Sequence, residues 1–137
     1  MSKEVISTVI SAVISTEEAP AAIGPYSQAV RAGNLVFLSG QIPLVPETME
    51  LISDDIAEQA QQMFTNLQAV AVAAGGSLDD LVKVNIYLTD IDNFQAVNQV
   101  MESFFTAPYP ARAAVGVAQL PRGAAVEVEA IMAAPDT

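Results

Sequence analysis

The clearest structural signal in the sequence is the stretch DDIAEQAQQMFTNLQAVAVAAGG, residues 54–76. Its apolar residues recur at alternating spacings of four and three, which places them on one face of a helix. Asp55 precedes Glu58 at the spacing of a capping box, and Gly75-Gly76 provides a C-terminal stop. The stretch therefore predicts a long amphipathic helix over about 54–74. Its inner face would carry Ile56, Ala60, Met63, Leu67, Val70 and Ala74.

A strand and a second helix are predicted after this helix. From Val82 to Leu88, apolar residues alternate with polar ones, as a half-buried strand requires. From about Asn93 to Phe105, apolar residues again fall on one helical face, and the prolines at 108 and 110 end the helix. Two last strands are expected over 111–118 and 124–132, joined as a hairpin through residues 120–123.

Strands are also predicted before the long helix. A short, imperfect Val-Ile-Ser repeat between Val5 and Thr16 is rich in β-branched residues and favours an edge strand. Two prolines and a glycine within 19–26 predict an ordered, non-helical loop. Two further strands are expected, at 27–31 and 35–41, before a loop over 43–53 that is rich in Pro and Glu.

The order strands, helix, strand, helix, strands predicts an α+β fold, a mixed β-sheet with two α-helices on one face. A length of 137 residues is typical of one domain, so we expect a single domain over 1–137. The other sheet face then needs a cover. Because the chain is 52% hydrophobic with a mean hydropathy of +0.39, we expect another copy of the chain to supply it.

The composition excludes many kinds of chemistry. The sequence has no cysteine, histidine or tryptophan, so disulfides, thiolate zinc sites, Cys nucleophiles and His bases are ruled out, and no ligand pattern for a metal is present. Sixteen acidic residues against five basic ones give a net charge of −11, which disfavours nucleic acids and anionic membranes as partners. No membrane-spanning apolar run or secretory leader is evident, so we expect a cytoplasmic protein.

Arg112 is the most informative of the five cations. It lies in a predicted strand of small apolar residues, PARAAVGV, with no carboxylate nearby in the sequence. A poorly solvated guanidinium needs a partner. That partner is either a carboxylate elsewhere in the fold or a planar anionic ligand that the guanidinium binds through two hydrogen bonds.

Two glutamates share one face of the last strand. Alternation in VEVEA places Glu127 and Glu129 together, while the residues between them face the other way. One of them could neutralise Arg112 or orient a water, or both could simply be solvated on the sheet surface. The residues alone do not separate these hypotheses.

Five separated blocks of the sequence resemble the Rid family (RidA, formerly YjgF) in that family's order and spacing. The similarity begins near Val13, so we expect residues 1–12 to be an N-terminal extension, to which the resemblance assigns no role. The blocks are APAAIGPYSQA at 19–29, SGQIP at 39–43, FQAVN at 94–98, PAR at 110–112 and VEVEAI at 126–131.

The resemblance implies a fold, an assembly and an activity. It implies a chorismate-mutase-like fold and a homotrimer with active sites between subunits. It also implies an enamine/imine deaminase, which hydrolyses 2-aminoacrylate-type enamines and 2-imino acids to 2-oxo acids and ammonium without a cofactor. A non-catalytic binding module for 2-oxo acids or other small carboxylates stays open as the alternative. A chaperone or ribonuclease side activity is not decided by the sequence.

The resemblance also assigns roles to individual residues. By position, the family's carboxylate-binding arginine is Arg112 and its water-orienting glutamate is Glu127. Ala114 stands where many members have cysteine, which changes the pocket floor without removing a group that the reaction needs. The residues that match cleft positions are Tyr26, Ser39, Gly40 and Asn98.

Overall fold

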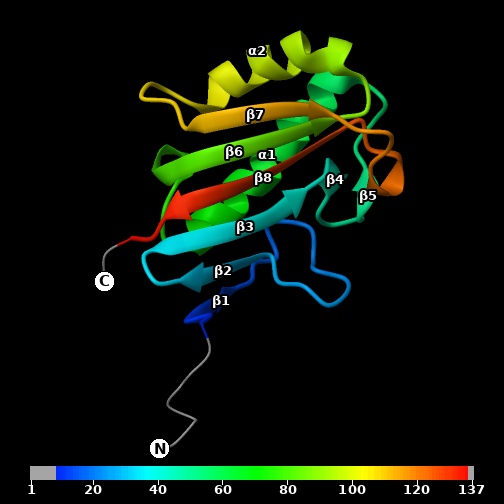
Figure 1. Cartoon of the computed structure of the whole chain (residues 1–137). Coiled ribbons are helices and arrows are strands. Elements are labelled where there is room, and N and C mark those ends of the chain that lie inside the picture. Colours follow the sequence, from blue (N-terminus) through cyan, green and yellow to red (C-terminus); the bar gives the residue numbers. More distant parts are fainter. Residues whose placement is uncertain (1–8, 136–137) are drawn as a thin grey trace, which may run out of the picture.

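Both predicted helices are present in a computed structural model of the protein, which describes residues 9–135 (Figure 1). The first is α1, Ile56–Ala73, and Asp55 caps it by accepting a hydrogen bond from the Glu58 backbone N–H at 3.0 Å. Gly75 follows α1 with a φ of 92°, a conformation that glycine adopts readily. The second helix is α2, Phe94–Phe104, and it buries Val97 and Met101 on the predicted face.

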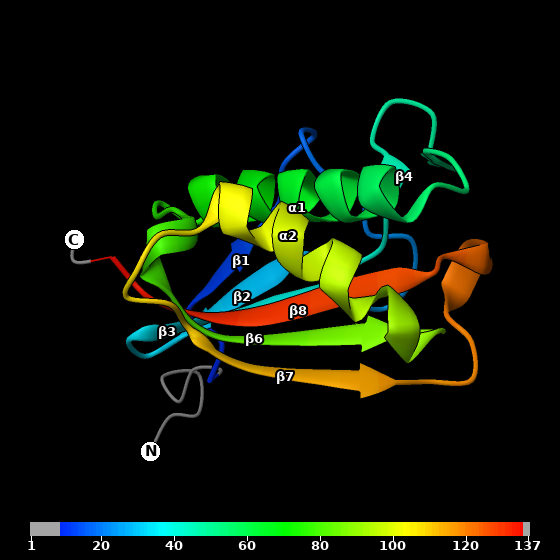
Figure 2. The same cartoon turned by 90° about the horizontal axis from the view of Figure 1, so that it is seen from above.

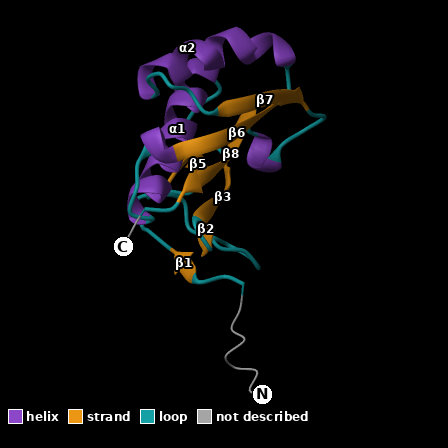
Figure 3. Cartoon of the chain, turned by 60° about the vertical axis from the view of Figure 1, so that its left-hand side comes forward, coloured by secondary structure: helices purple, strands orange, loops and turns teal. Residues whose placement is uncertain are grey.

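Six strands form the main sheet, in the order β1-β2-β3-β8-β6-β7. All neighbours are antiparallel except β6 and β7, which run parallel and are connected through α2, so the sheet is mixed as predicted. Strands β1 and β7 lie at its two edges (Figure 3). The strands are β1 Ala12–Ile14, β2 Ala29–Ala32, β3 Leu35–Gln41, β6 Leu81–Leu88, β7 Ala111–Gly116 and β8 Val126–Ala133.

The expected hairpin between the last two strands is wrong. β6 lies between β7 and β8, so β8 pairs with β6 on one side and with β3 on the other. The connection runs from residue 117 to residue 125 and contains the short helix η3, Pro121–Gly123. This segment is long enough to pass the end of β6, which a tight hairpin turn is not.

The segment 43–53 differs from its prediction as a loop, whereas the described part of the N-terminal repeat agrees with its prediction. The loop over 43–53 contains a small hairpin of β4, Leu44–Val45, and β5, Glu50–Leu51. The first part of the Val-Ile-Ser repeat lies outside the described residues. Its last part forms β1, which is an edge strand as expected.

The two helices lie on the same side of the sheet (Figure 2). The core fills the space between these layers, where the fully buried Phe64 of α1 packs its ring 5.5 Å from Phe104 and 5.8 Å from Phe105. The other sheet face is open and partly apolar: Phe37 is 41% exposed and Val115 is 45% exposed. The layered α+β fold with two helices on one face is therefore confirmed.

Replacing Phe64 with alanine should strongly destabilise the fold. The ring is fully buried between both helices and the sheet, so its removal leaves a cavity and should lower the free energy of unfolding by about 3 to 5 kcal/mol. Urea denaturation at one protein concentration measures this. Val72→Ala, on the exposed side of α1, is the matched control and should change stability by less than about 0.5 kcal/mol. Equal losses in the two variants would contradict this description of the core.

Candidate functional site

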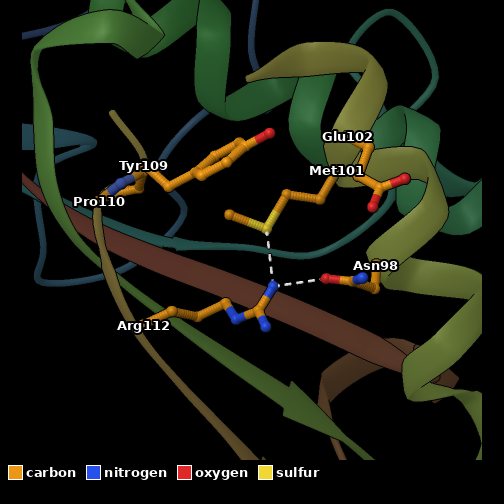
Figure 4. Close-up of a pocket in the computed structure, with 6 residues that line it drawn as sticks. All are labelled: Asn98, Met101, Glu102, Tyr109, Pro110 and Arg112. Atoms are coloured by element: carbon orange, nitrogen blue, oxygen red, sulfur yellow. Dashed lines mark hydrogen bonds between the residues drawn. The ribbon is translucent and has the colours of Figure 1, made fainter. Parts of the chain in front are cut away.

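Arg112 lines a pocket of about 370 Å³ between α2 and the segment that leads into β7. Its guanidinium donates to Oδ1 of Asn98 at 2.6 Å and to the sulfur of Met101 at 3.6 Å, and it lies 4.9 Å from the centre of the Phe94 ring. Figure 4 shows the hydrogen bonds from Arg112 to Asn98 and Met101, with α2 facing Arg112 and Tyr109 across the pocket. The lining residues are Asn98, Met101, Glu102, Tyr109, Pro110 and Arg112.

No carboxylate among the described residues forms an ion pair with Arg112. The neutral amide, thioether and ring around it hold the guanidinium in place without neutralising its charge. Arg112 is also exposed in the single chain, so it can reach a ligand. Of the two partners considered from the sequence, these contacts favour an anionic ligand.

The other predicted site residues line a second pocket, of about 600 Å³. Tyr26 and Ser39 reach it from the N-terminal half of the chain, and Glu127 reaches it from the central strand β8. The Ser39 hydroxyl donates to the Ser27 carbonyl, which ties β3 to the segment carrying Tyr26. The lining includes Tyr26, Ser39, Gly40, Arg122, Glu127 and Glu129.

Gly40 is needed for the position of Glu127. A Cβ built at Gly40 would collide with Oε2 of Glu127. The register between β3 and β8 shifts between Leu38 and Gln41, which is where Gly40 lies. The bulge and the missing side chain together let the carboxylate lie against the β3 backbone.

Glu127 is half-buried, and no described residue donates a hydrogen bond to its carboxylate. Burial raises the pKa of the Glu127 carboxyl above its ordinary value, and the negative charge of Glu129 raises it further. A carboxylate with raised proton affinity in a pocket is typical of a group that accepts and returns a proton.

Arg112 and Glu127 lie on opposite faces of the sheet. Arg112 is in register with Val84, whose side chain is buried under the helices, whereas Glu127 is in register with Tyr87 on the open face. The structure therefore brings Arg112 together with Asn98, and Glu127 together with Tyr26, Ser39 and Gly40. A single chain does not bring the two sets together, so one substrate molecule cannot contact both Arg112 and Glu127 of the same chain.

Buried amides hold the walls of the second pocket, and sequence reasoning missed them. Gln28 bonds to the backbone of Thr16 and Pro20, which fixes the segment before Tyr26. Asn66 of α1 donates to the carbonyls of Ile42 and Leu44. The sequence did carry a signal for Asn66. It directly precedes Leu67, a residue of the predicted apolar face, so a polar side chain lies beside the buried face of the helix.

Two features are absent from residues 9–135, namely a cluster of metal-ligating side chains and a membrane-spanning helix. Within residues 9–135, no three His, Cys, Asp or Glu side chains gather closely enough to hold a metal ion. In the same part of the chain, none of the helices combines the length and the apolar character that crossing a membrane requires.

Comparisons with known proteins agree with one another. The family described as Endoribonuclease L-PSP matches residues 16–134. A 2-iminobutanoate/2-iminopropanoate deaminase of Dermatophagoides farinae is 52% identical over 120 residues, which cover 88% of this chain and 94% of the relative. The crystal structure of RidA from the Antarctic bacterium Psychrobacter sp. is similar with a TM-score of 0.86 and 52% identity, covering 89% of this chain and 98% of that one. The crystal structure of E. coli TdcF with bound serine has a TM-score of 0.85 and 43% identity, with coverages of 89% and 98%.

Replacing Glu127 with glutamine should stabilise the protein at alkaline pH. Because the pKa of Glu127 is raised in the folded state, its unfavourable contribution is absent below the unfolded pKa and develops as pH rises through the folded pKa. Glu127→Gln removes this contribution, so its melting temperature should exceed that of the unchanged protein at about pH 8 and match it at about pH 4. Glu47→Gln, an exposed control, should change neither value. A lower melting temperature for Glu127→Gln at about pH 8 would contradict the raised pKa.

Proposed function

The chain belongs to the Rid family, and on this premise we propose that it is an enamine/imine deaminase that hydrolyses 2-aminoacrylate-type enamines and 2-imino acids to 2-oxo acids and ammonium. Its α+β fold is the chorismate-mutase-like fold of its structural neighbours. The observation that carries the proposal is the pair of complementary pockets, one with an unneutralised arginine and one with a protonatable glutamate.

Arg112 is the group that binds the substrate carboxylate. Its planar guanidinium can form two parallel hydrogen bonds with a carboxylate, each contributing about 1.5 to 3 kcal/mol. Asn98 and Phe94 restrict the guanidinium, so it is oriented before the substrate arrives. Asn98 therefore acts through Arg112, because its oxygen already accepts a hydrogen bond from the guanidinium.

Glu127 is the group that exchanges protons during hydrolysis. A water attacks C2 of the iminium, the C2–O bond forms, the electron pair of the C=N bond moves to nitrogen, and Glu127 takes the proton that the water loses. Glu127 then returns a proton to nitrogen, the C–N bond breaks as the C2 carbonyl forms, and the proton of the C2 hydroxyl passes to the departing ammonia, which leaves as ammonium. The iminium carbon is already electrophilic, so this chemistry needs no metal or organic cofactor.

The active site is formed between copies of the chain. Because Arg112 and Glu127 lie on opposite faces of one sheet, a shared substrate requires Arg112 of one copy and Glu127 of another. The open face carries exposed Val13, Phe37 and Val115, which a neighbouring copy would cover. We infer a homotrimer, in which three equivalent interfaces close a ring and provide three sites.

Small-molecule chemistry fits the described residues better than RNA cleavage. The net charge of −11 and the paired glutamates of the second pocket would repel a phosphate backbone. The bound serine in E. coli TdcF shows that a related protein takes a small amino acid ligand. We therefore propose imino and 2-oxo acids as ligands, no nucleic-acid or membrane partner, and a cytoplasmic location.

A coupled assay tests the proposal directly. Serine or cysteine is converted enzymatically to 2-aminoacrylate, and pyruvate and ammonia formation are followed with and without this protein. A deaminase increases the rate in proportion to its concentration. A non-catalytic binding module for small carboxylates leaves the rate unchanged, while calorimetry still detects binding of 2-oxobutanoate.

Replacing Arg112 should remove most of the activity while leaving the fold intact. Arg112→Ala loses both hydrogen bonds to the substrate carboxylate, and kcat/KM should fall by at least about 100-fold. Arg112→Lys keeps the charge but loses the planar fork, so its kcat/KM should fall by about tenfold or more. Arg31→Lys is the matched control, because Arg31 donates to the Gly33 carbonyl away from both pockets. Unchanged rates in both Arg112 variants would refute its assignment.

Mixing two inactive variants should restore activity. Arg112→Ala and Glu127→Gln trimers, dissociated together and reassembled at equal amounts, would contain sites with an intact Arg112 from one copy and an intact Glu127 from another. Random assembly gives about a quarter of the sites this composition, hence about a quarter of the unchanged protein's rate. Sedimentation equilibrium should give three times the 14.4 kDa chain mass. No recovery on mixing, or a monomer mass at micromolar concentration, would contradict a shared site.

A further inference from the structure

Glu129 is held in place by two side chains of the neighbouring strand. The Tyr87 hydroxyl donates to its Oε2 at 2.7 Å, and the Asn85 amide donates to the same oxygen at 3.1 Å. All three side chains are half-buried on the open face, where β6 and β8 pair. A carboxylate with two donors at this depth is not a freely solvated surface group, so the interpretation of Glu127 and Glu129 as two solvated glutamates is wrong.

Tyr87 bonds to the glutamate that is not its direct partner. In the β6·β8 register, Asn85 is opposite Glu129 and Tyr87 is opposite Glu127. The Tyr87 hydroxyl nevertheless donates to Glu129, and Glu127 receives no hydrogen bond from any described residue. Glu127 and Glu129, two positions apart on one strand face, therefore differ in their contacts. Two hydrogen bonds hold the Glu129 carboxylate in place, whereas the Glu127 carboxylate accepts none from the described residues.

We propose that Glu129 is a positioning residue for the deaminase reaction, a negative charge anchored by Tyr87 and Asn85 that keeps Glu127 ready to take and return a proton. The inference rests on the proposed function, because it assigns Glu129 a part in the same site. Glu129 does not touch the substrate in this role and acts only through Glu127. The hydrogen bonds from Tyr87 and Asn85 hold the Glu129 carboxylate in place at the wall of the second pocket, on the same strand face as Glu127.

The chemistry of hydrolysis explains why such a charge is useful. Glu127 must first accept a proton from the attacking water and then donate one to the leaving nitrogen, and both steps improve when its proton affinity lies nearer the working pH. Burial and the charge of Glu129 both raise the pKa of Glu127. The hydrogen bond to Glu129 is also the main cause that raises the pKa of Tyr87, so this phenol stays protonated and continues to donate.

Within one copy of the chain, the other charged or titratable groups near Glu127 do not offset Glu129. In the proposed trimer, Arg112 of a neighbouring copy also faces Glu127, and it opposes the effect of Glu129 until a substrate carboxylate neutralises it. On the open face, β6 also carries Lys83, and the second pocket also contains Tyr26 and Arg122. Within residues 9–135, neither cation forms an ion pair with Glu127 or Glu129. Arg122 instead donates to the Met49 carbonyl at 2.7 Å. Within one copy, Glu129 is therefore the nearby charge with a defined effect on Glu127.

The test follows the protonation of Glu127 directly and compares it with turnover. Full-length protein labelled with 13C-glutamate is titrated by NMR, with the Glu127 carboxyl resonance assigned from its loss in Glu127→Gln. In Glu129→Gln, which keeps the side-chain shape but removes the charge, the Glu127 midpoint should move to lower pH. The acid limb of kcat/KM should move in the same direction, while the plateau above it falls by less than about tenfold.

Two further variants separate the charge from the anchor. Tyr87→Phe keeps both glutamates but frees Glu129, so its Glu127 midpoint should lie between those of the unchanged protein and Glu129→Gln. It also serves as the second test if Glu129→Gln does not fold. Glu47→Gln removes an exposed carboxylate elsewhere and should move neither the midpoint nor the acid limb.

The outcomes distinguish this inference from the proposed function. An unmoved Glu127 midpoint in Glu129→Gln, in a protein that hydrolyses imines, overturns the role of Glu129 and leaves the deaminase assignment standing. A midpoint that moves in a protein with no imine hydrolysis overturns the proposed function instead. A midpoint in Tyr87→Phe equal to that of the unchanged protein overturns the anchoring role of Tyr87.

Discussion

The position of β8 in the middle of the sheet is the constraint on which the rest of the structure depends. It is paired on both sides, so every second residue must be apolar enough to lie under the helices. Val126, Val128 and Met132 meet this condition and are fully buried. The intervening glutamates are then forced onto the open face, at the centre of the sheet, where they line a pocket beside β3.

The same alternation, applied to β7, separates the two halves of the chemistry. β7 runs parallel to β6, and its register places Arg112 on the helix side, against Asn98 of α2. A shift of one residue would place Arg112 on the face of Glu127 and bury a different set of side chains. The fold therefore holds an anion-binding group and a proton-transfer group rigidly, but on opposite faces. Separating them also keeps Arg112 from being neutralised by Glu127 of its own chain.

How far the sequence predicts this structure depends on the range of each interaction. The helices were predictable because periodicity and the Asp55 cap are local, and the α+β layering followed from the order of elements. The placement of β8 between β3 and β6 was not predictable, since it depends on strand pairing across the whole chain. Strand context brought Arg112 to notice and alternation brought Glu127 and Glu129 to notice, whereas the roles of Arg112 and Glu127 came from the family resemblance. Residue spacing alone could not show that they occupy opposite faces, or that Tyr87 anchors Glu129.

Assembly and proton transfer are coupled in the proposed trimer. The open face combines an apolar part, which includes Phe37 and Val13, with the polar group of Tyr87, Asn85 and the two glutamates. When a second copy covers the apolar part, the polar group loses contact with water, and the repulsion between Glu127 and Glu129 strengthens as the local dielectric falls. Glu127 and Glu129 are already close within one copy, because they lie two positions apart on one strand face. Association therefore changes their surroundings, and the proton affinity of Glu127 in the trimer depends on the loss of water, on Glu129 and on Arg112 of the neighbouring copy.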